Sequence, residues 1–231
     1  MICISCPVQT EALTYALYHL HAAGFSTASG NTTHLLLPVP CKIPGSELNA
    51  LLQKLPKDIS VVGGNLTDSA LTSYKKIDLL QDPIYVAKNA DITAHCAVKL
   101  ASAAIPATLA DCKALVIGWG RIGKCLARLL RQNGAAVTVS ARKEADRGML
   151  EALGYCTQVA PDPTGFDLVF NTVPVMVLPQ CPKGPLYIEL ASLPGMEGEE
   201  IIDGRGLPNR LAPKSSGKLI AETLLRILNK E

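Results

Sequence analysis

Three glycines in the second half of the chain give the clearest chemical signal of the sequence. The apolar residues 114–117 lead into Gly118-Trp-Gly120-Arg-Ile-Gly123, and an amphipathic segment follows. In a strand–turn–helix of this pattern, the first glycine permits a tight turn, the second lets the backbone approach a pyrophosphate, and the third lets helix and strand pack closely. We therefore expect a dinucleotide on the free N–H groups at the helix start. The alternative, a glycine turn without a ligand, is disfavoured by the flanking strand and helix. The residues expected to line the ligand are Gly118, Trp119, Gly120, Arg121, Ile122 and Gly123.

The end of the next predicted strand indicates which dinucleotide to expect. NAD-binding chains usually place an acidic residue there, because it bonds the ribose 2′-hydroxyl. This chain instead has Ser140-Ala-Arg142-Lys143, with no acid before Glu144. Ser140 can donate a hydrogen bond to a 2′-phosphate, and Arg142 can bind it bidentately with Lys143 alongside. We therefore predict NADP(H) rather than NAD(H). The alternative is a solvated basic pair at a helix start.

Polar residues follow two later predicted strands. The first of these groups is the segment Asn171-Thr172-Val173-Pro174. Because open α/β sheets bind ligands at the carboxyl ends of their strands, we expect this segment near the nicotinamide ribose or carboxamide, unless it is only a polar turn. Ser192 follows the next strand in the same way, and Glu189 lies inside that otherwise apolar strand. Glu189 is either a paired buried acid or a participant in the site, and the sequence favours neither.

Two further residues are candidates for proton transfer and charge recognition. His95 lies four residues after Asp91 on one predicted helix face, so it either exchanges a proton with a substrate or pairs with Asp91 at the surface. Lys214 stands at a predicted helix start, where it would bind a substrate carboxylate, or else is a solvated lysine. We take Asn171, Ser192, His95 and Lys214 as the candidate catalytic residues.

A parallel sheet must position these residues, because predicted strands and helices alternate through the second half. The patterns predict strands at 113–117, 136–140, 166–171 and 186–190, and helices at 121–132, 144–153 and about 215–229.

The first half forms a smaller α/β unit in this interpretation. Ile105-Pro106 interrupts the last helical pattern, which places a domain boundary within 104–112. The sequence thus predicts an α/β fold of two Rossmann-like domains with parallel sheets and a cleft between them, over residues 1–103 and 104–231. In this half we expect strands at 2–5, 34–39 and 59–62, and helices at 10–22, 46–54, 66–74 and 89–104.

Composition excludes several classes of protein. A net charge of +2 without a basic stripe is not typical of nucleic-acid binding. The sequence has neither an apolar run of about 18 residues nor a basic leader, so we expect a cytoplasmic protein without a membrane span. Of the eight cysteines, Cys125 lies on the apolar face of a predicted helix and Cys112 adjoins a predicted strand, which is typical of free, buried cysteine and argues against disulfides. Cys3-Ile-Ser-Cys6 lacks a second ligand pair, so no metal is predicted.

The motifs of the second half together resemble the A subunit of dipicolinate synthase and, more distantly, the cofactor domains of D-2-hydroxyacid dehydrogenases. The resemblance spans residues 114–230, extends weakly to 89–100, and fits 1–80 poorly. It rests on the segments 116–123, 139–142, 171–174, 190–195 and 212–217.

This resemblance implies a sporulation enzyme that uses NADP(H) on a small cyclic or 2-oxo (di)carboxylic acid, in a cleft between two Rossmann-like domains. It also implies a last helix that returns to the first domain, a homodimer and a second synthase subunit. Two positions depart from the family pattern: His95 replaces a glutamate and Leu193 replaces an arginine. An oxidoreductase of this type is the first interpretation. A dinucleotide-binding sensor or partner subunit without turnover is the second, and a 2-hydroxyacid dehydrogenase is the third.

Overall fold

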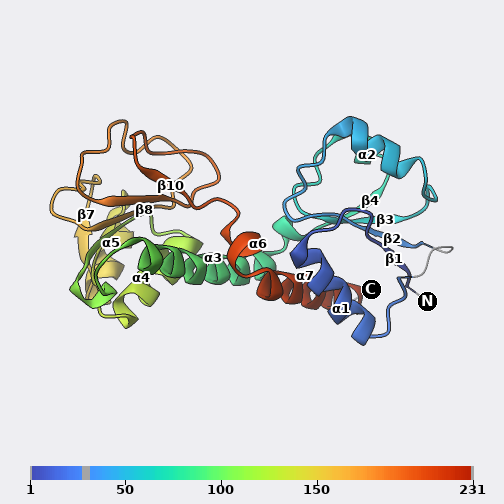
Figure 1. The fold of residues 1–231 in the computed structure, drawn as a ribbon, viewed down its shortest axis with the longest axis horizontal. Coiled ribbons are helices and arrows are strands. Elements are labelled where there is room, and N and C mark those ends of the chain that lie inside the picture. The colour runs from blue at the N-terminus through green and yellow to red at the C-terminus, as the bar shows by residue number, and fades with distance from the viewer. Residues whose placement is uncertain (1, 28–31, 230–231) are drawn as a thin grey trace. The chain divides into compact units, whose positions relative to one another are not determined.

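The computed structural model describes residues 2–27 and 32–229, which divide into two compact units (Figure 1). The described residues up to 89 and those from 208 onward form the first unit, and residues 90–207 form the second. The division therefore falls inside helix α3 (Pro83–Ala104) and not within 104–112. The C-terminal helix α7 (Pro213–Leu228) belongs to the first unit.

The first unit is built on a four-stranded parallel sheet in the order β1-β2-β3-β4. Helix α1 begins after Thr10, whose hydroxyl accepts a hydrogen bond from the backbone N–H of Leu13 at 3.2 Å. Helix α7 packs against α1, and a side chain at Gly217 would clash with the Ala12 carbonyl, so glycine permits the close approach. The unit contains β1 (Ile4–Ser5), α1 (Glu11–Ala22), β2 (His34–Leu36), α2 (Gly45–Leu52), β3 (Ser60–Gly63) and β4 (Lys75–Asp78).

One predicted element of this unit is wrong. Residues 66–74 form no α-helix; they hold only a short 3-10 turn at Ser69–Leu71, and β4 follows. The Asp78 carboxylate, at the end of β4, accepts hydrogen bonds from the backbone N–H groups of Asn65 and Leu66, which joins the start of this segment to the strand. Strand β4 is at the sheet edge and begins with two exposed lysines. Its sequence therefore lacks the alternating apolar pattern by which a strand is predicted.

The second unit is a six-stranded, wholly parallel sheet in the order β10-β9-β8-β5-β6-β7. The bounds of β5, α4 and β6 are those predicted. The two outermost strands are three residues long and partly exposed, so their patterns are too short to predict. Its elements are β5 (Lys113–Ile117), α4 (Arg121–Gln132), β6 (Ala136–Ser140), α5 (Glu144–Ala152), β7 (Cys156–Gln158), β8 (Leu168–Asn171), β9 (Leu186–Glu189) and β10 (Ile201–Asp203), and a short helix α6 (Leu207–Leu211) follows.

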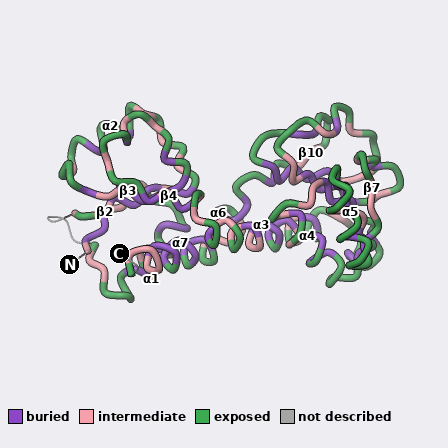
Figure 2. The backbone as a smooth tube through the Cα atoms, turned by 180° about the vertical axis from the view of Figure 1, so that it is seen from behind, coloured by how far each residue is buried: buried purple, intermediate pink, exposed green. Residues whose placement is uncertain are grey.

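In both units the strands contain many buried residues (Figure 2), and most of these are aliphatic. In the second unit, all four residues of β8 are buried, and Leu115, Ile117 and Val169 belong to one apolar cluster. This core fixes the central strands and therefore the level at which each of them ends. No helix among the described residues is long and apolar enough to cross a membrane.

Candidate dinucleotide-binding site

The register of the second sheet aligns the last residues of five strands. Ser140 pairs with Ile117, Ile117 with Asn171, Asn171 with Glu189, and Glu189 with Asp203. The loops after these strands therefore all leave from one carboxyl edge. The strand order reverses between β5 and β8, and open parallel sheets bind their ligands outside the carboxyl ends at such a point.

The glycine turn after β5 has the conformation that the motif requires. Gly118 has a φ of +102°, and a side-chain Cβ there would lie 2.6 Å from the Thr172 hydroxyl oxygen. A Cβ at Gly123 would clash with the Gly118 carbonyl, so the helix packs tightly on the turn. Gly120 differs, because no described atom lies within 4 Å of its Cβ position. Two glycines thus serve packing, and the third leaves open space beside the backbone.

The start of α4 is available to an anion. No side chain of the described residues caps this helix, and its first intrahelical bond runs from the Lys124 N–H to the Gly120 carbonyl at 3.0 Å. The N–H groups of the preceding turn are therefore not used within the helix. Arg121 is exposed and Ile122 is half-buried. This arrangement fits a pyrophosphate.

Trp119, between the first two glycines, is held by aromatic packing. Its ring meets the Tyr155 ring edge-on, with centroids 5.8 Å apart, and the Lys124 ammonium lies 5.8 Å from its centroid. Its side chain therefore braces the turn, and its backbone is the part that can face a phosphate.

The loop after β6 presents two basic side chains. The Arg147 guanidinium donates to the carbonyls of Ala141 and Arg142, at 2.9 and 2.7 Å, and so fixes the loop backbone. Arg142 and Lys143 are exposed, and within the described part of the chain the Arg142 guanidinium has no ion-pair partner. Ser140 is only 4% exposed. Arg142 is thus the group in this loop best suited to an anionic ligand.

Asn171 lies at the centre of the edge and is wholly buried. Its amide nitrogen donates to both Glu189 oxygens, at 2.9 and 3.1 Å, and to the Val173 carbonyl at 3.0 Å. Its amide oxygen accepts from the Val173 N–H at 2.9 Å. Thr172 is also engaged, because its hydroxyl donates to the Ile117 carbonyl at 2.8 Å. The groups that this turn leaves at the surface are Val173, half-buried, and Pro174, exposed.

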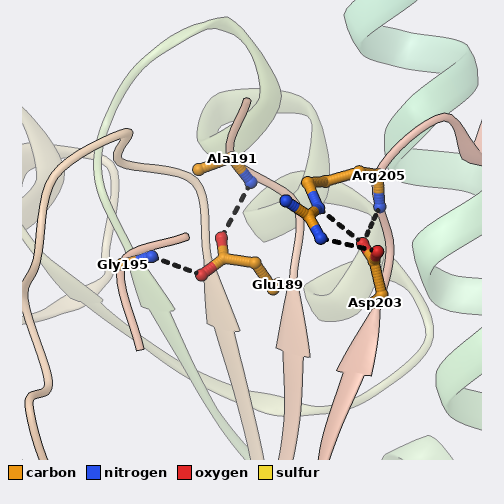
Figure 3. Close-up of polar contacts among 5 residues, drawn as sticks. All are labelled: Glu189, Ala191, Gly195, Asp203 and Arg205. Atoms are coloured by element: carbon orange, nitrogen blue, oxygen red, sulfur yellow. Dashed lines mark hydrogen bonds and ion pairs between the residues drawn. The ribbon is translucent and has the colours of Figure 1, made fainter. Parts of the chain in front are cut away.

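Glu189 is a buried acid with a full set of partners. It is 4% exposed and accepts hydrogen bonds from the backbone N–H groups of Ala191 at 3.0 Å and Gly195 at 2.8 Å (Figure 3). The Asn171 amide is its further donor. Gly195 is needed for this contact, since a Cβ there would clash with the Asn171 amide. Of the two sequence interpretations, the structure shows the paired buried acid. The only sequence signal for it was an acid that ends an apolar strand.

The loop 190–195 that Glu189 organises presents Ser192, Leu193 and Pro194 at the surface. Leu193 is 61% exposed. A cation that sequence analysis missed follows the neighbouring strand: Arg205 bonds Asp203 with its Nε and Nη2 atoms, both at 2.8 Å. The Asp203 carboxylate raises the pKa of Arg205.

The remaining candidates lie outside the loops of this edge. His95 is on α3, where its Nε2 atom lies 3.7 Å from the Asp91 carboxylate and its side chain is 62% exposed. Asp91 also pairs with Arg128 of α4 at 3.1 Å. Lys214 is exposed at the second position of α7, in the first unit. Their roles stay predictions.

Two other observations bear on ligands. A hollow of about 560 Å³ is lined by residues that include Pro182, Pro185, Tyr187 and Glu199, around the amino end of β9. Among residues 2–27 and 32–229, no three His, Cys, Asp or Glu side chains gather as a metal site. The carboxyl edge is therefore the candidate site on chemical grounds, whereas the hollow lacks the glycine turn and the basic loop.

Comparison with known proteins gives one curated relative and several similar structures, and no protein-family model matches. The A subunit of dipicolinate synthase from Bacillus subtilis (strain 168) is 30% identical over 139 residues, which cover 52% of this chain and 46% of the relative. The match thus spans about half the length of that relative.

The fold similarity extends further than the sequence similarity. A crystal structure of the A subunit of dipicolinate synthase from Bacillus halodurans matches with a TM-score of 0.81 at 19% identity, over 98% of this chain and 97% of that one. A transhydrogenase structure from Sinorhizobium meliloti matches with a TM-score of 0.73 at 16% identity, over 98% and 93%. At these identities the comparisons show a shared fold.

Proposed function

We propose that this chain, whose sequence and fold support its assignment to the family of dipicolinate synthase A subunits, is an oxidoreductase that uses NADP(H). The main support for this proposal is the set of features at the carboxyl edge of the second sheet. There an uncapped helix start, open space beside Gly120 and the exposed Arg142 follow adjacent strands. The three features match the pyrophosphate and the 2′-phosphate of one ligand.

In this proposal each part of the edge has one task. The N–H groups at the start of α4 bind the pyrophosphate, and Arg142 binds the 2′-phosphate with Lys143 alongside. The turns after β8 and β9, joined through Asn171 and Glu189, form the wall on the nicotinamide side. The cofactor supplies hydride transfer, and the protein supplies position and charge.

The substrate class follows from the relative, which is named as a synthase of dipicolinate. We propose a small cyclic or 2-oxo (di)carboxylic acid, with Ser192 beside it and His95 as the proton donor or acceptor. Lys214 stays a separate candidate for binding a carboxylate. We also propose a homodimer and, because the relative is named as one subunit of its synthase, a second synthase subunit. Light scattering and co-purification test these two assemblies.

A second candidate function is a dinucleotide-binding protein without turnover. The observations that favour it are the apolar, 61% exposed Leu193 on the loop after β9 and the pairing of His95 with Asp91 at the surface. Neither arrangement offers a cation to an anionic substrate.

One experiment separates the two functions. Titration with NADPH and NADH tests the cofactor, and NADPH consumption or formation is then followed with a panel of cyclic and 2-oxo dicarboxylic acids. Tight NADPH binding with turnover supports the oxidoreductase. Binding with no turnover on any member of the panel supports the sensor or partner subunit, and tighter NADH binding contradicts the assignment of Arg142.

A further inference from the structure

We propose that Glu189 selects the oxidation state of the bound cofactor, because its buried negative charge favours the cationic nicotinamide ring of the oxidised form. Glu189 acts here through its charge and needs no contact with the ring. This inference rests on the proposed function, since it requires a nicotinamide dinucleotide at the carboxyl edge.

The Glu189 carboxylate is surrounded by hydrogen-bond donors. The hydrogen-bond partners of the Glu189 carboxylate among the described residues are N–H donors: the Asn171 amide, which reaches both oxygens, and the backbone groups of Ala191 and Gly195. An ionised carboxylate is an acceptor only, so it satisfies all of these donors, whereas a protonated one would have to place its own hydrogen among them. These donors carry no formal charge, so they stabilise the carboxylate without neutralising its formal negative charge.

The charged side chains near Glu189 determine how much of its charge is paired. Within the described part of the chain, no ion pair reaches Glu189. Arg205 is close enough for Glu189 to contribute, after Asp203, to the raised pKa of its guanidinium. That guanidinium is, however, bound to Asp203 through two nitrogens (Figure 3). The Arg205 guanidinium is thus engaged by Asp203 and forms no ion pair with Glu189 among the described residues.

The order of the strands puts Glu189 on the nicotinamide side of the expected ligand. Arg142 follows β6 and the glycine turn follows β5, so the adenosine half of a dinucleotide lies over these strands. The opposite half then extends over β8 and β9, the next strands of the sheet. Glu189 ends β9 and holds the turn after β8 through Asn171, which puts its charge on the nicotinamide side.

The consequence is a difference in affinity between the two redox forms. The oxidised nicotinamide ring is cationic and the reduced ring is neutral, so only the oxidised form gains from a nearby anion. A buried charge is weakly screened, and its effect on a ring several ångströms away is on the order of a several-fold change in affinity. Binding of the reduced form should hardly respond.

Two variants with opposite expected effects test this inference. Glu189→Gln removes the negative charge and keeps the size of the side chain. Arg205→Gln removes the exposed cation and leaves Glu189 in place. Dissociation constants for oxidised and reduced NADP are measured through the fluorescence of Trp119, the single tryptophan of the chain, which lies in the glycine turn. Glu199→Gln, which removes an exposed carboxylate at the amino end of β9, is the matched control.

We expect Glu189→Gln to raise the ratio of the oxidised to the reduced dissociation constant by about 3- to 10-fold, and Arg205→Gln to lower it. Glu199→Gln should leave it unchanged. Equal weakening of both forms in Glu189→Gln, with no change of ratio in Arg205→Gln, makes Glu189 purely structural and overturns the inference. If Glu189→Gln does not fold, the double variant Arg205→Gln/Asp203→Asn decides, because it removes both charges of the exposed ion pair and leaves the Glu189 charge in place; an unchanged ratio there overturns the inference. Wild-type protein that binds neither form contradicts the proposed function itself, whereas binding with a constant ratio contradicts only this inference.

Discussion

The Asn171 amide nitrogen lies 2.9 and 3.1 Å from the two carboxylate oxygens of Glu189, so the ends of β8 and β9 are joined side chain to side chain. Both residues are buried. The geometry of the loops after β8 and β9 therefore depends on one polar contact. A substitution of either residue should alter the conformation of both loops.

Asn171→Ala should therefore destabilise the second unit by about 1–3 kcal/mol, because Glu189 and the Val173 N–H each lose a buried hydrogen-bond partner. Denaturant unfolding followed through Trp119 fluorescence measures this change. The exposed Ser192 gives the control, since Ser192→Ala should stay within about 0.5 kcal/mol of the wild type. Equal stability of the two variants would contradict the importance of the pair.

Arg142→Asp should weaken NADPH binding by about 1–3 kcal/mol and change NADH binding much less, because only NADPH presents a 2′-phosphate to the guanidinium. Calorimetric titration of both cofactors checks it. Lys183→Ala, at an exposed position near the amino end of β9, serves as the control for a lost positive charge. An unchanged NADPH affinity in Arg142→Asp removes this residue from the site.

The first two glycines of the turn should respond differently to alanine. Gly118→Ala places a Cβ at a φ of +102° and 2.6 Å from the Thr172 hydroxyl oxygen, so it should cost stability by about 1 kcal/mol or more. Gly120 has an extended backbone and open space, so Gly120→Ala should fold like the wild type yet weaken NADPH binding. Thermal unfolding and cofactor titration on the two variants separate packing from ligand approach.

His95→Ala should reduce turnover without changing NADPH affinity if the imidazole transfers a proton to substrate, as proposed. The ion pair between Asp91 and Arg128 remains in the variant, so stability should hardly change. Steady-state rates and thermal unfolding are the measurements. Full activity in the variant would make His95 a surface partner of Asp91.

A pH effect is expected in the first unit. The Arg226 guanidinium lies 2.6 Å from Asp82 and holds the pKa of that carboxyl below its usual value. A carboxyl with a lowered folded-state pKa stabilises the fold above its unfolded pKa, about 3.9, and the contribution is lost as pH falls through the folded value. Asp82→Asn should therefore reduce stability at neutral pH and flatten its decline in acid, as measured by unfolding between pH 7 and pH 2. A parallel decline in the variant would exclude this pair.

The sequence predicted those parts of the second unit in which hydrophobic period and glycine chemistry agree. Strand β5, helix α4 and strand β6 have the predicted bounds because their apolar residues are buried where the period requires. The edge strands β4, β7 and β10 were not predicted, because short, partly exposed strands lack an alternating apolar pattern.

Side-chain networks were harder to predict than elements. Asn171 was expected to touch a ligand, and its position at a strand end is as predicted. Its burial and its bonds to Glu189 depend on the register between β8 and β9, which no local pattern contains. The pairing of Arg205 with Asp203 lies at the end of a strand that was itself unpredicted.

The alignment of Ser140, Ile117, Asn171, Glu189 and Asp203 at one level of the sheet has an evolutionary consequence. Because the five strands end at one level, their loops all lie beyond the sheet. Substitutions in a loop therefore leave the packing of the strands unaltered. The exposed tip of 192–194 can diversify while Glu189 and Gly195 hold its two ends. Such a scaffold allows a lineage to acquire new substrates by exchanging loop sequences on an unchanged framework.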